Sequence, residues 1–175
     1  MKQKDIVFVG GIHGVGKSTL CSKFNNLLGI SHYSASDLIK KKNKDLVNTS
    51  KTVIDVSGNQ NVLIEAINEY VVEDKFLLDG HFALFNAEQD VIQIPLSTFE
   101  SLSPIGIVLL IDDVKAIVKR IEYRDNIKHS LSKYESLQSV EIESARTVSD
   151  KLNIPLFIHD VNNELFELEN FIKGI

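Results

Sequence analysis

The residues of this chain best suited to do chemistry lie near its beginning, in the stretch GGIHGVGKST (10–19). Residues 11–18 match the spacing G-x-x-x-x-G-K-[ST], with an apolar run before them and helical spacing after them. Glycines let backbone N–H groups approach phosphate oxygens, and a helix N-terminus adds a favourable dipole. The stretch therefore predicts a loop that binds the phosphates of a nucleoside triphosphate. The alternative is a glycine turn with a chance Lys-Ser pair, and the flanking strand and helix disfavour it.

Each position of this loop has an expected role towards ATP and Mg²⁺. Lys17 should reach the β- and γ-phosphates, Ser18 should ligate Mg²⁺, and Thr19 should touch the α-phosphate. His13 stands at a free position of the motif, either as an ordinary loop residue or as a sensor of the γ-phosphate. The nucleotide-binding residues predicted in the loop are Gly11, His13, Gly14, Val15, Gly16, Lys17, Ser18 and Thr19.

A second candidate group is an acid, Asp79, which directly follows the apolar run KFLL (75–78). An acid at the carboxyl end of a parallel strand can hold Mg²⁺ or accept the proton of an attacking hydroxyl. A simple turn aspartate is the alternative. The pair Asp112 and Asp113 competes for the same role, but it precedes a helix and could cap it. His81 could line an acceptor pocket or pack as a loop residue.

The only arginines of the chain are Arg120, Arg124 and Arg146, and all fall around the polar stretch 126–138. Arg120 and Arg124 are four residues apart, so they share one helix face. Arginines neutralise the charge that phosphoryl transfer spreads over the transferred group. We therefore expect these three to be catalytic, with a solvated basic face paired with neighbouring acids as the alternative.

Polar residues that could bind a phosphoryl acceptor lie in two short segments. YSASDLIKKK (33–42) should neighbour the phosphate loop, and GNQN (58–61) begins a helix. Lys40 could bind an acceptor phosphate and Gln60 could hydrogen-bond a base edge, although helix capping by Ser36 and Asn59 explains those segments equally well. The predicted acceptor-binding residues are Ser34, Ser36, Asp37, Lys40, Gln60 and His81.

The apolar runs indicate which elements position these groups. Helical patterns alternate with five runs that are typical of buried strands: 6–10, 32–36, 75–80, 105–113 and 154–160. This order predicts an α/β fold, a P-loop NTPase three-layer sandwich with a five-stranded parallel sheet, helices on both faces and a small lid. Residues 81–95 fit a hairpin or an extended excursion, and STFE (97–100) fits a capping box.

No repeat or linker divides the chain, so we expect a single domain over residues 1–175. Within it, an acceptor-binding segment should span about 35–72 and a lid about 120–140. Residues 126–138 are polar and weakly patterned, and we expect them to be mobile.

Composition excludes several classes of protein. The 175 residues are 43% hydrophobic and 25% charged, as in ordinary globular proteins, and the net charge of −5 disfavours a general nucleic-acid binder. The single cysteine, Cys21, allows no internal disulfide and fits a reducing compartment. No apolar run approaches the ~20 residues of a membrane span, and the first run is too short for a signal peptide. We expect a cytoplasmic protein without a membrane partner, either monomeric or dimeric.

Taken in order, these segments resemble the P-loop nucleoside monophosphate kinases, and are most similar to the archaeal-type adenylate kinases and related small kinases of AAA type. GGIHGVGKST resembles the nucleotide loop of that family, SASDLIK its S-T-G-D-x-x-R acceptor segment, and LLDGH its D-T-H segment. IPLSTFESLSPIGIVLLIDD resembles the stretch from a G-L-P turn to the fourth strand, RIEYRD the entry to the lid, and ESARTVSDKLNIPLFI the helix and strand after it.

The resemblance implies that Asp37, Asp79 and His81 lie in the site and that the three arginines lie at the lid. It also implies that Asn162, within HDVNNE, lies where the backbone wraps the adenine. The chain departs from the family at Ala35, where a threonine is usual, and at Lys40, where an arginine is usual. The predicted lid stretch 126–138 also contains only lysines as basic residues besides one histidine. These departures leave the identity of the acceptor open.

The sequence thus predicts a Mg·ATP-dependent kinase that acts on a nucleotide-like acceptor, of the nucleoside monophosphate kinase type. The alternatives are an ATP-binding regulatory ATPase, or a kinase of a nucleoside, a small alcohol or a nucleic-acid 5′ end. A GTPase is disfavoured because HDVNNE lacks the N-K-x-D guanine motif.

Overall fold

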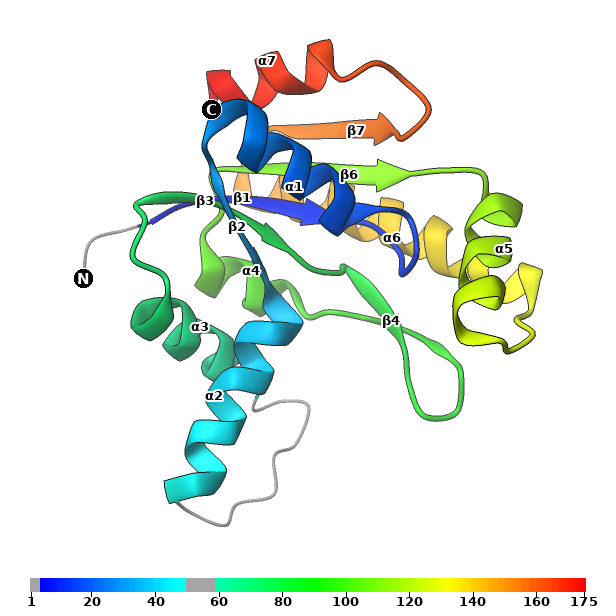
Figure 1. Cartoon of the computed structure of the whole chain (residues 1–175), viewed down its shortest axis with the longest axis horizontal. Helices are drawn as coiled ribbons and strands as arrows, with labels where there is room; N and C mark the ends of the chain where they lie inside the picture. The colour runs from blue at the N-terminus through cyan, green and yellow to red at the C-terminus, as the bar shows by residue number, and fades with distance from the viewer. Residues whose placement is uncertain (1–3, 50–58) are drawn as a thin grey trace.

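The computed structural model describes residues 4–49 and 59–175, and it has the predicted α/β architecture (Figure 1). Five parallel strands form one sheet in the order β2-β3-β1-β6-β7. Their bounds are β1 (Asp5–Gly10), β2 (Ser31–Ser34), β3 (Lys75–Asp79), β6 (Gly106–Ile111) and β7 (Leu156–Asp160). The carboxyl ends of β1, β3 and β6 therefore lie side by side at one edge of the sheet.

Helices cover both faces of this sheet, and none in the described part of the chain has the length and apolar character needed to cross a bilayer. The helices are α1 (Lys17–Leu28), α2 (Ala35–Thr49), α3 (Asn59–Tyr70), α4 (Leu96–Leu102), α5 (Val114–Asp125), α6 (Leu131–Leu152) and α7 (Phe166–Gly174).

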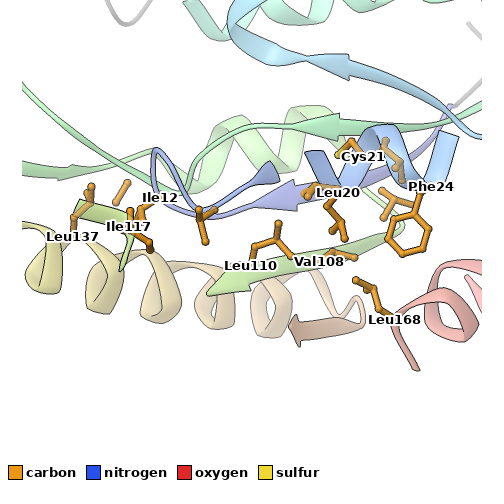
Figure 2. Packing of buried hydrophobic residues seen from close by; sticks show 14 of the residues in the cluster. Ile12, Leu20, Cys21, Phe24, Val108, Leu110, Ile117, Leu137 and Leu168 are labelled. Carbon is orange, nitrogen blue, oxygen red and sulfur yellow. The ribbon is translucent and has the colours of Figure 1, made fainter. Parts of the chain in front are cut away.

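The central strand β1 separates two hydrophobic cores, because its side chains alternate between the faces of the sheet. Val7 and Val9 join the core under α1 and α7, whereas Ile6 and Phe8 join the core under α3 and α4. Figure 2 shows the first core, where Leu20, Cys21 and Phe24 of α1 lie near residues of β6 and α7. Each fully buried aliphatic or aromatic side chain contributes about 1.5–3 kcal/mol, so these cores hold the loop-bearing strand rigidly.

The structure tests two helix caps that the sequence suggested. The Asp113 carboxylate accepts a hydrogen bond from the Ala116 N–H over 2.9 Å, so Asp113 is the N-cap of α5. The predicted capping box at 97–100 is wrong: α4 begins after Pro95, and no side chain caps it. The Ser97 hydroxyl instead faces the Gln60 amide oxygen at 3.5 Å.

The secondary structure of two segments was not evident from the sequence. Residues 81–95 contain an antiparallel hairpin, β4 (Ala83–Phe85) with β5 (Val91–Gln93). The stretch 126–138 is only partly irregular, because α6 begins at Leu131. Tyr134 and Leu137 are buried on this helix, and the polar residues between them conceal their helical spacing.

Residues 50–58 lie outside the described residues, so the predicted acceptor segment 35–72 is described only in part. The predicted helix start at 58 falls in the same gap.

Candidate active site

The predicted phosphate-binding loop connects β1 to α1, and its glycines are required by its shape. Gly14 has φ 82°, and a Cβ atom at this position would lie 2.6 Å from the Ile121 side chain of α5. Gly16 has φ 109° and is the N-cap of α1. Larger residues would be strained at both positions. The loop thus ends at a helix N-terminus, where backbone N–H groups and the helix dipole favour an anion.

Lys17 is the first residue of α1, and its ammonium group is held by the loop itself. It donates hydrogen bonds to the carbonyl oxygens of Gly11 at 2.6 Å and Ile12 at 3.2 Å. The side chain is only 8% exposed. Burial lowers the pKa of Lys17 to about 8, while the carboxylates of Glu141 and Asp79 oppose the shift. A phosphate group would replace these carbonyl oxygens as the partner of the ammonium.

Ser18 and Thr19, which follow Lys17, expose their hydroxyl groups. Both residues are exposed, and neither hydroxyl makes a hydrogen bond within the described part of the chain. Mg²⁺ prefers hard oxygen ligands, which a serine hydroxyl and a carboxylate supply. The predicted pair Ser18 and Asp79 therefore fits Mg²⁺ by its donor chemistry.

Asp79 ends β3 and is paired with a histidine that the sequence analysis missed. The Nε2 atom of His32, from the neighbouring strand β2, lies 2.5 Å from Oδ2 of Asp79. His32 stands beside Leu77 in the strand register, and Leu77 and Asp79 share a face of the sheet. Asp79 is only 7% exposed. Its carboxylate is thus fixed in direction at the sheet edge beside the loop.

Cys21 lies close to this pair. Ligand atoms of Cys21, His32 and Asp79 all fall within 4.8 Å of one another. Burial raises the pKa of Cys21 to about 12, so its thiol stays protonated at neutral pH. A protonated thiol and an imidazole are poor ligands for Mg²⁺, so the group does not replace the Ser18 and Asp79 pair as a magnesium site.

A buried carboxylate on α6, Glu141, connects the loop to the β3–β4 connection, and the sequence analysis missed it too. Its Oε1 accepts a hydrogen bond from the Gly11 N–H at 2.8 Å. Its Oε2 accepts from the N–H groups of Phe82 at 3.0 Å and Ala83 at 2.6 Å. Burial raises the pKa of Glu141, while these three hydrogen bonds and Lys17 oppose the shift. The available signal was its position on the buried face of the helix, between Leu137 and Ala145.

A cavity of about 500 Å³ opens beside Asp79, between α2, α3, α4 and the β4–β5 hairpin. Four of the predicted acceptor-binding residues line it: Ser34, Ser36, Gln60 and His81. The other two, Asp37 and Lys40, do not line it and instead pair with each other at 3.3 Å on the exposed side of α2. We call this space the acceptor cavity.

The side-chain amide of Gln60 is hydrogen-bonded to residues of α4. Its Nε2 donates to the Ser97 carbonyl and the Ser101 hydroxyl, both at 2.8 Å, and its Oε1 lies 3.3 Å from the Thr98 hydroxyl. Gln60 therefore joins α3 to α4 in this structure. Burial, Lys17 and His13 lower the pKa of His81 to about 3, so the His81 imidazole is neutral at any working pH.

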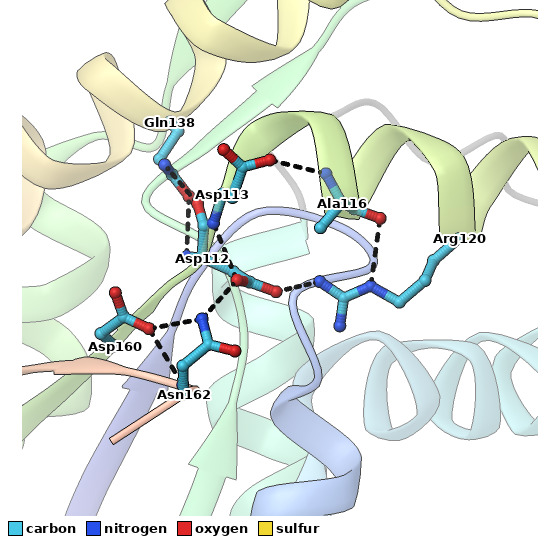
Figure 3. Close-up of polar contacts among 7 residues, drawn as sticks. All are labelled: Asp112, Asp113, Ala116, Arg120, Gln138, Asp160 and Asn162. Atoms are coloured by element: carbon cyan, nitrogen blue, oxygen red, sulfur yellow. Dashed lines mark hydrogen bonds and ion pairs between the residues drawn. The ribbon is translucent and has the colours of Figure 1, made fainter.

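Arg120 and Asn162 meet at one carboxylate, that of Asp112 (Figure 3). Arg120 forms an ion pair with Oδ2 of Asp112, whereas Asn162 donates to Oδ1 at 2.9 Å. Gln138 bonds both backbone groups of Asp112. Asp112 is nine-tenths buried at the end of β6. The predicted residues Arg120 and Asn162 thus come together, through an acid that the sequence analysis had treated as a possible cap.

Arg124 lies at the phosphate loop. Its Nη2 is 2.6 Å from Nε2 of His13, and its guanidinium also bonds Asp125 at 2.6 and 2.8 Å. Burial and the charge of Arg124 lower the pKa of His13, so the neutral ring accepts a hydrogen bond from Arg124. Arg146 is exposed on α6 and makes no hydrogen bond or ion pair within residues 4–49 and 59–175. Its catalytic role stays a prediction.

Comparisons with known proteins give the family of the chain. One solved structure with the same fold is a gluconokinase from Sinorhizobium meliloti 1021, at 15% sequence identity and a TM-score of 0.53, covering 99% of this chain and 91% of that chain. A search of curated proteins gives no significant match. The family model described as AAA domain matches residues 10–139, a range that begins at the phosphate loop and includes Asp79 and both arginines of α5. Since that match covers most of the chain, the protein belongs to the AAA domain family.

Proposed function

We propose that this protein is a Mg·ATP-dependent phosphotransferase that moves the γ-phosphate of ATP to a small acceptor. The observation that supports the proposal is that Asp79, which pairs with Val9 just before the phosphate loop, also lines the acceptor cavity. Asp79 lines the cavity, and its charge is close enough to Lys17 to oppose the lowering of the Lys17 pKa. A site that only hydrolysed ATP would need no cavity of this size at that position.

On the nucleotide side, Lys17 would leave the carbonyl oxygens of Gly11 and Ile12 and bind the β- and γ-phosphates. The Thr19 hydroxyl would bind the α-phosphate. Ser18 and Asp79 would hold Mg²⁺, which supplies charge neutralisation at the phosphates when it is bound.

On the acceptor side, Asp79 would accept the proton of the acceptor hydroxyl as that oxygen bonds to the γ-phosphorus. The bond from the γ-phosphorus to the bridging oxygen then breaks, and ADP leaves. His32 would hold the Asp79 carboxylate in direction through its contact at 2.5 Å. Arg124, placed at the loop beside His13, would neutralise the transferring group.

The narrower prediction is an adenylate kinase-like enzyme whose acceptor is a nucleoside monophosphate. It is supported by the order of the resembling segments along the chain. Its expected phosphate-binding residue, Lys40, lies outside the acceptor cavity and is paired with Asp37. The nucleoside monophosphate acceptor is therefore one outcome of the assay below.

The test is transfer of labelled γ-phosphate from ATP, with Mg²⁺, to a panel of nucleosides, nucleoside monophosphates and small alcohols. We expect one class of acceptor to raise ADP formation by orders of magnitude and to carry the label. Slow ADP release that no acceptor changes would contradict the proposal and favour a regulatory ATPase. Labelling of an oligonucleotide 5′ end alone would favour a nucleic-acid kinase.

A further inference from the structure

We infer that the acceptor is an uncharged compound with an aromatic or otherwise apolar body and a hydroxyl group, and that it enters the acceptor cavity without a phosphate. The inference rests on the proposed function, because it names the substrate class of the same site. It depends on three features of the cavity: its charges, its apolar floor and the state of its polar groups.

The charges of the cavity do not suit an anion. Among the described residues that line it, none is a lysine or an arginine, and the single carboxylate is that of Asp79. The candidate cation, Lys40, has 70% of its side chain exposed and is paired with Asp37. Burying a phosphate without a cationic partner is strongly unfavourable, because its charges lose their hydration. The described lining offers no such partner, so the cavity selects against phosphorylated acceptors.

The floor of the cavity is aromatic. The rings of Phe8 and Phe99 line it and pack edge to face, with centroids 5.3 Å apart. Phe82 stacks on Phe99, with centroids 4.7 Å apart, and meets Phe8 edge to face at 5.0 Å. Aliphatic residues from α2, α3 and β5 form much of the remaining wall: Ile39, Leu63 and Ile92. Such a floor favours a flat or apolar body, and the volume of about 500 Å³ lies within the usual range for bound small molecules.

The polar groups of the cavity limit where a hydroxyl can bind. At one end, Gln60 gives its amide to α4, so it offers little to a ligand. At the other end, Asp79, Gly80 and His81 line the cavity where β3 ends next to the phosphate loop. The hydroxyl of the acceptor therefore lies at the Asp79 end, where it can reach the γ-phosphate, and the apolar body lies over the phenylalanines.

A matched pair of fluorescent probes tests the charge preference without any catalysis. N-phenyl-1-naphthylamine is neutral, and its 8-sulfonate differs only by one anionic group. We expect the neutral probe to bind the wild-type protein about tenfold more tightly or better than the sulfonate. Equal affinities, tighter binding of the sulfonate, or no binding of the neutral probe would overturn the inference.

Variants show whether the preference comes from this cavity. Ser36→Lys adds a cation at the exposed rim, and Ile39→Lys adds one further inside, so that at least one variant should remain folded. Either should narrow or reverse the preference for the neutral probe. The control Ser139→Lys adds the same charge on the exposed side of α6, away from the cavity, and should change nothing. An effect of the control equal to that of the cavity variants would also overturn the inference.

The acceptor assay separates this inference from the proposed function. Nucleosides are compared with their own 5′-monophosphates, and aromatic alcohols with their phosphates. Transfer to uncharged members of the pairs supports both. Transfer to the phosphorylated members alone overturns the inference and leaves the phosphotransferase proposal intact. A neutral probe preference with no transfer to any acceptor supports the cavity assignment and contradicts the proposed function.

Discussion

The backbone N–H of Gly11 donates a hydrogen bond to the Glu141 carboxylate over 2.8 Å, although 130 positions separate the two residues in the chain. The second oxygen of the same carboxylate binds the Phe82 and Ala83 N–H groups, at the entrance of the β4–β5 hairpin. One buried acid on α6 thereby fixes the first glycine of the phosphate loop relative to a wall of the acceptor cavity. The phosphate loop and the β4–β5 hairpin are held in register by this contact.

Replacing Glu141 should therefore affect both stability and binding. In Glu141→Gln, an amide nitrogen takes the place of one carboxylate oxygen and faces N–H donors that need an acceptor. We expect a loss of about 2–4 kcal/mol in the free energy of unfolding, measured by urea denaturation, and weaker ATP binding. Glu143→Gln, on the exposed side of the same helix, is the matched control and should behave like wild type. Equal stabilities of the two variants would show that the Glu141 contact is dispensable.

The lowered pKa of Lys17 predicts how the affinity for ATP depends on pH. Its pKa is lowered to about 8 in the free protein, and bound phosphates would hold the ammonium charged. Proton uptake then accompanies binding above pH 8, so the Kd for ATP should rise as pH increases through 8, by up to about tenfold per pH unit. Fluorescence titration from pH 7 to 10 measures this dependence. Lys17→Met should bind ATP weakly and lack the dependence, whereas the exposed control Lys23→Met should retain it. A flat profile in the wild-type protein would contradict the role of Lys17.

Asp79 and His32 should differ in the size of their effects on catalysis. Asp79→Asn removes the base and should lower kcat by about 100-fold or more. His32→Gln leaves the carboxylate but loosens its direction, so a loss of about tenfold in kcat with an unchanged KM for ATP is expected. Single-turnover transfer measures both. Titration with Mg²⁺ tests the metal role of Asp79 separately: a raised half-saturation concentration in Asp79→Asn supports it, and an unchanged one leaves Asp79 with the proton-accepting role alone.

Arg124 and Arg146 should differ in the size of their effects on catalysis. Arg124 lies at the phosphate loop through His13, whereas Arg146 is exposed on α6 and has no partner among the described residues. Arg124→Ala should lower kcat at least about tenfold with little change in the Kd for ATP, because guanidinium neutralisation matters most in the transition state. Arg146→Ala should have a clearly smaller effect. Similar losses for the two variants would indicate that α6 moves over the site during turnover.

The parts of the fold that could be predicted from sequence are those with local signals. The apolar run of β1, the glycine spacing of the loop and the acid that ends β3 all lie within a few residues of the features that identify them. His32 and Glu141 were missed because their partners come from other segments. The contact of His32 with Asp79 depends on the pairing of β2 with β3, and that of Glu141 depends on where α6 crosses the loop.

Two further predictions also concern residues whose surroundings depend on contacts between distant segments. Gln60 has the chemistry to bind a base, but the position of α4 beside it gives its amide other partners. The polar stretch 126–138 contains the first turns of α6, because the buried pair Tyr134 and Leu137 is spaced for a helix that only the tertiary structure stabilises. Packing between distant segments determines both arrangements, and a single sequence does not show directly which segments pack together.

Cys21, the single thiol of the chain, lies fully buried on α1 behind the phosphate loop (Figure 2). Burial also raises the pKa of its thiol to about 12, so both access and ionisation keep it unreactive in the closed protein. A reagent can therefore modify this thiol only when the region around α1 opens. The rate at which a thiol reagent labels Cys21 reports how often α1 separates from the sheet, and bound nucleotide should slow that rate in proportion to its occupancy.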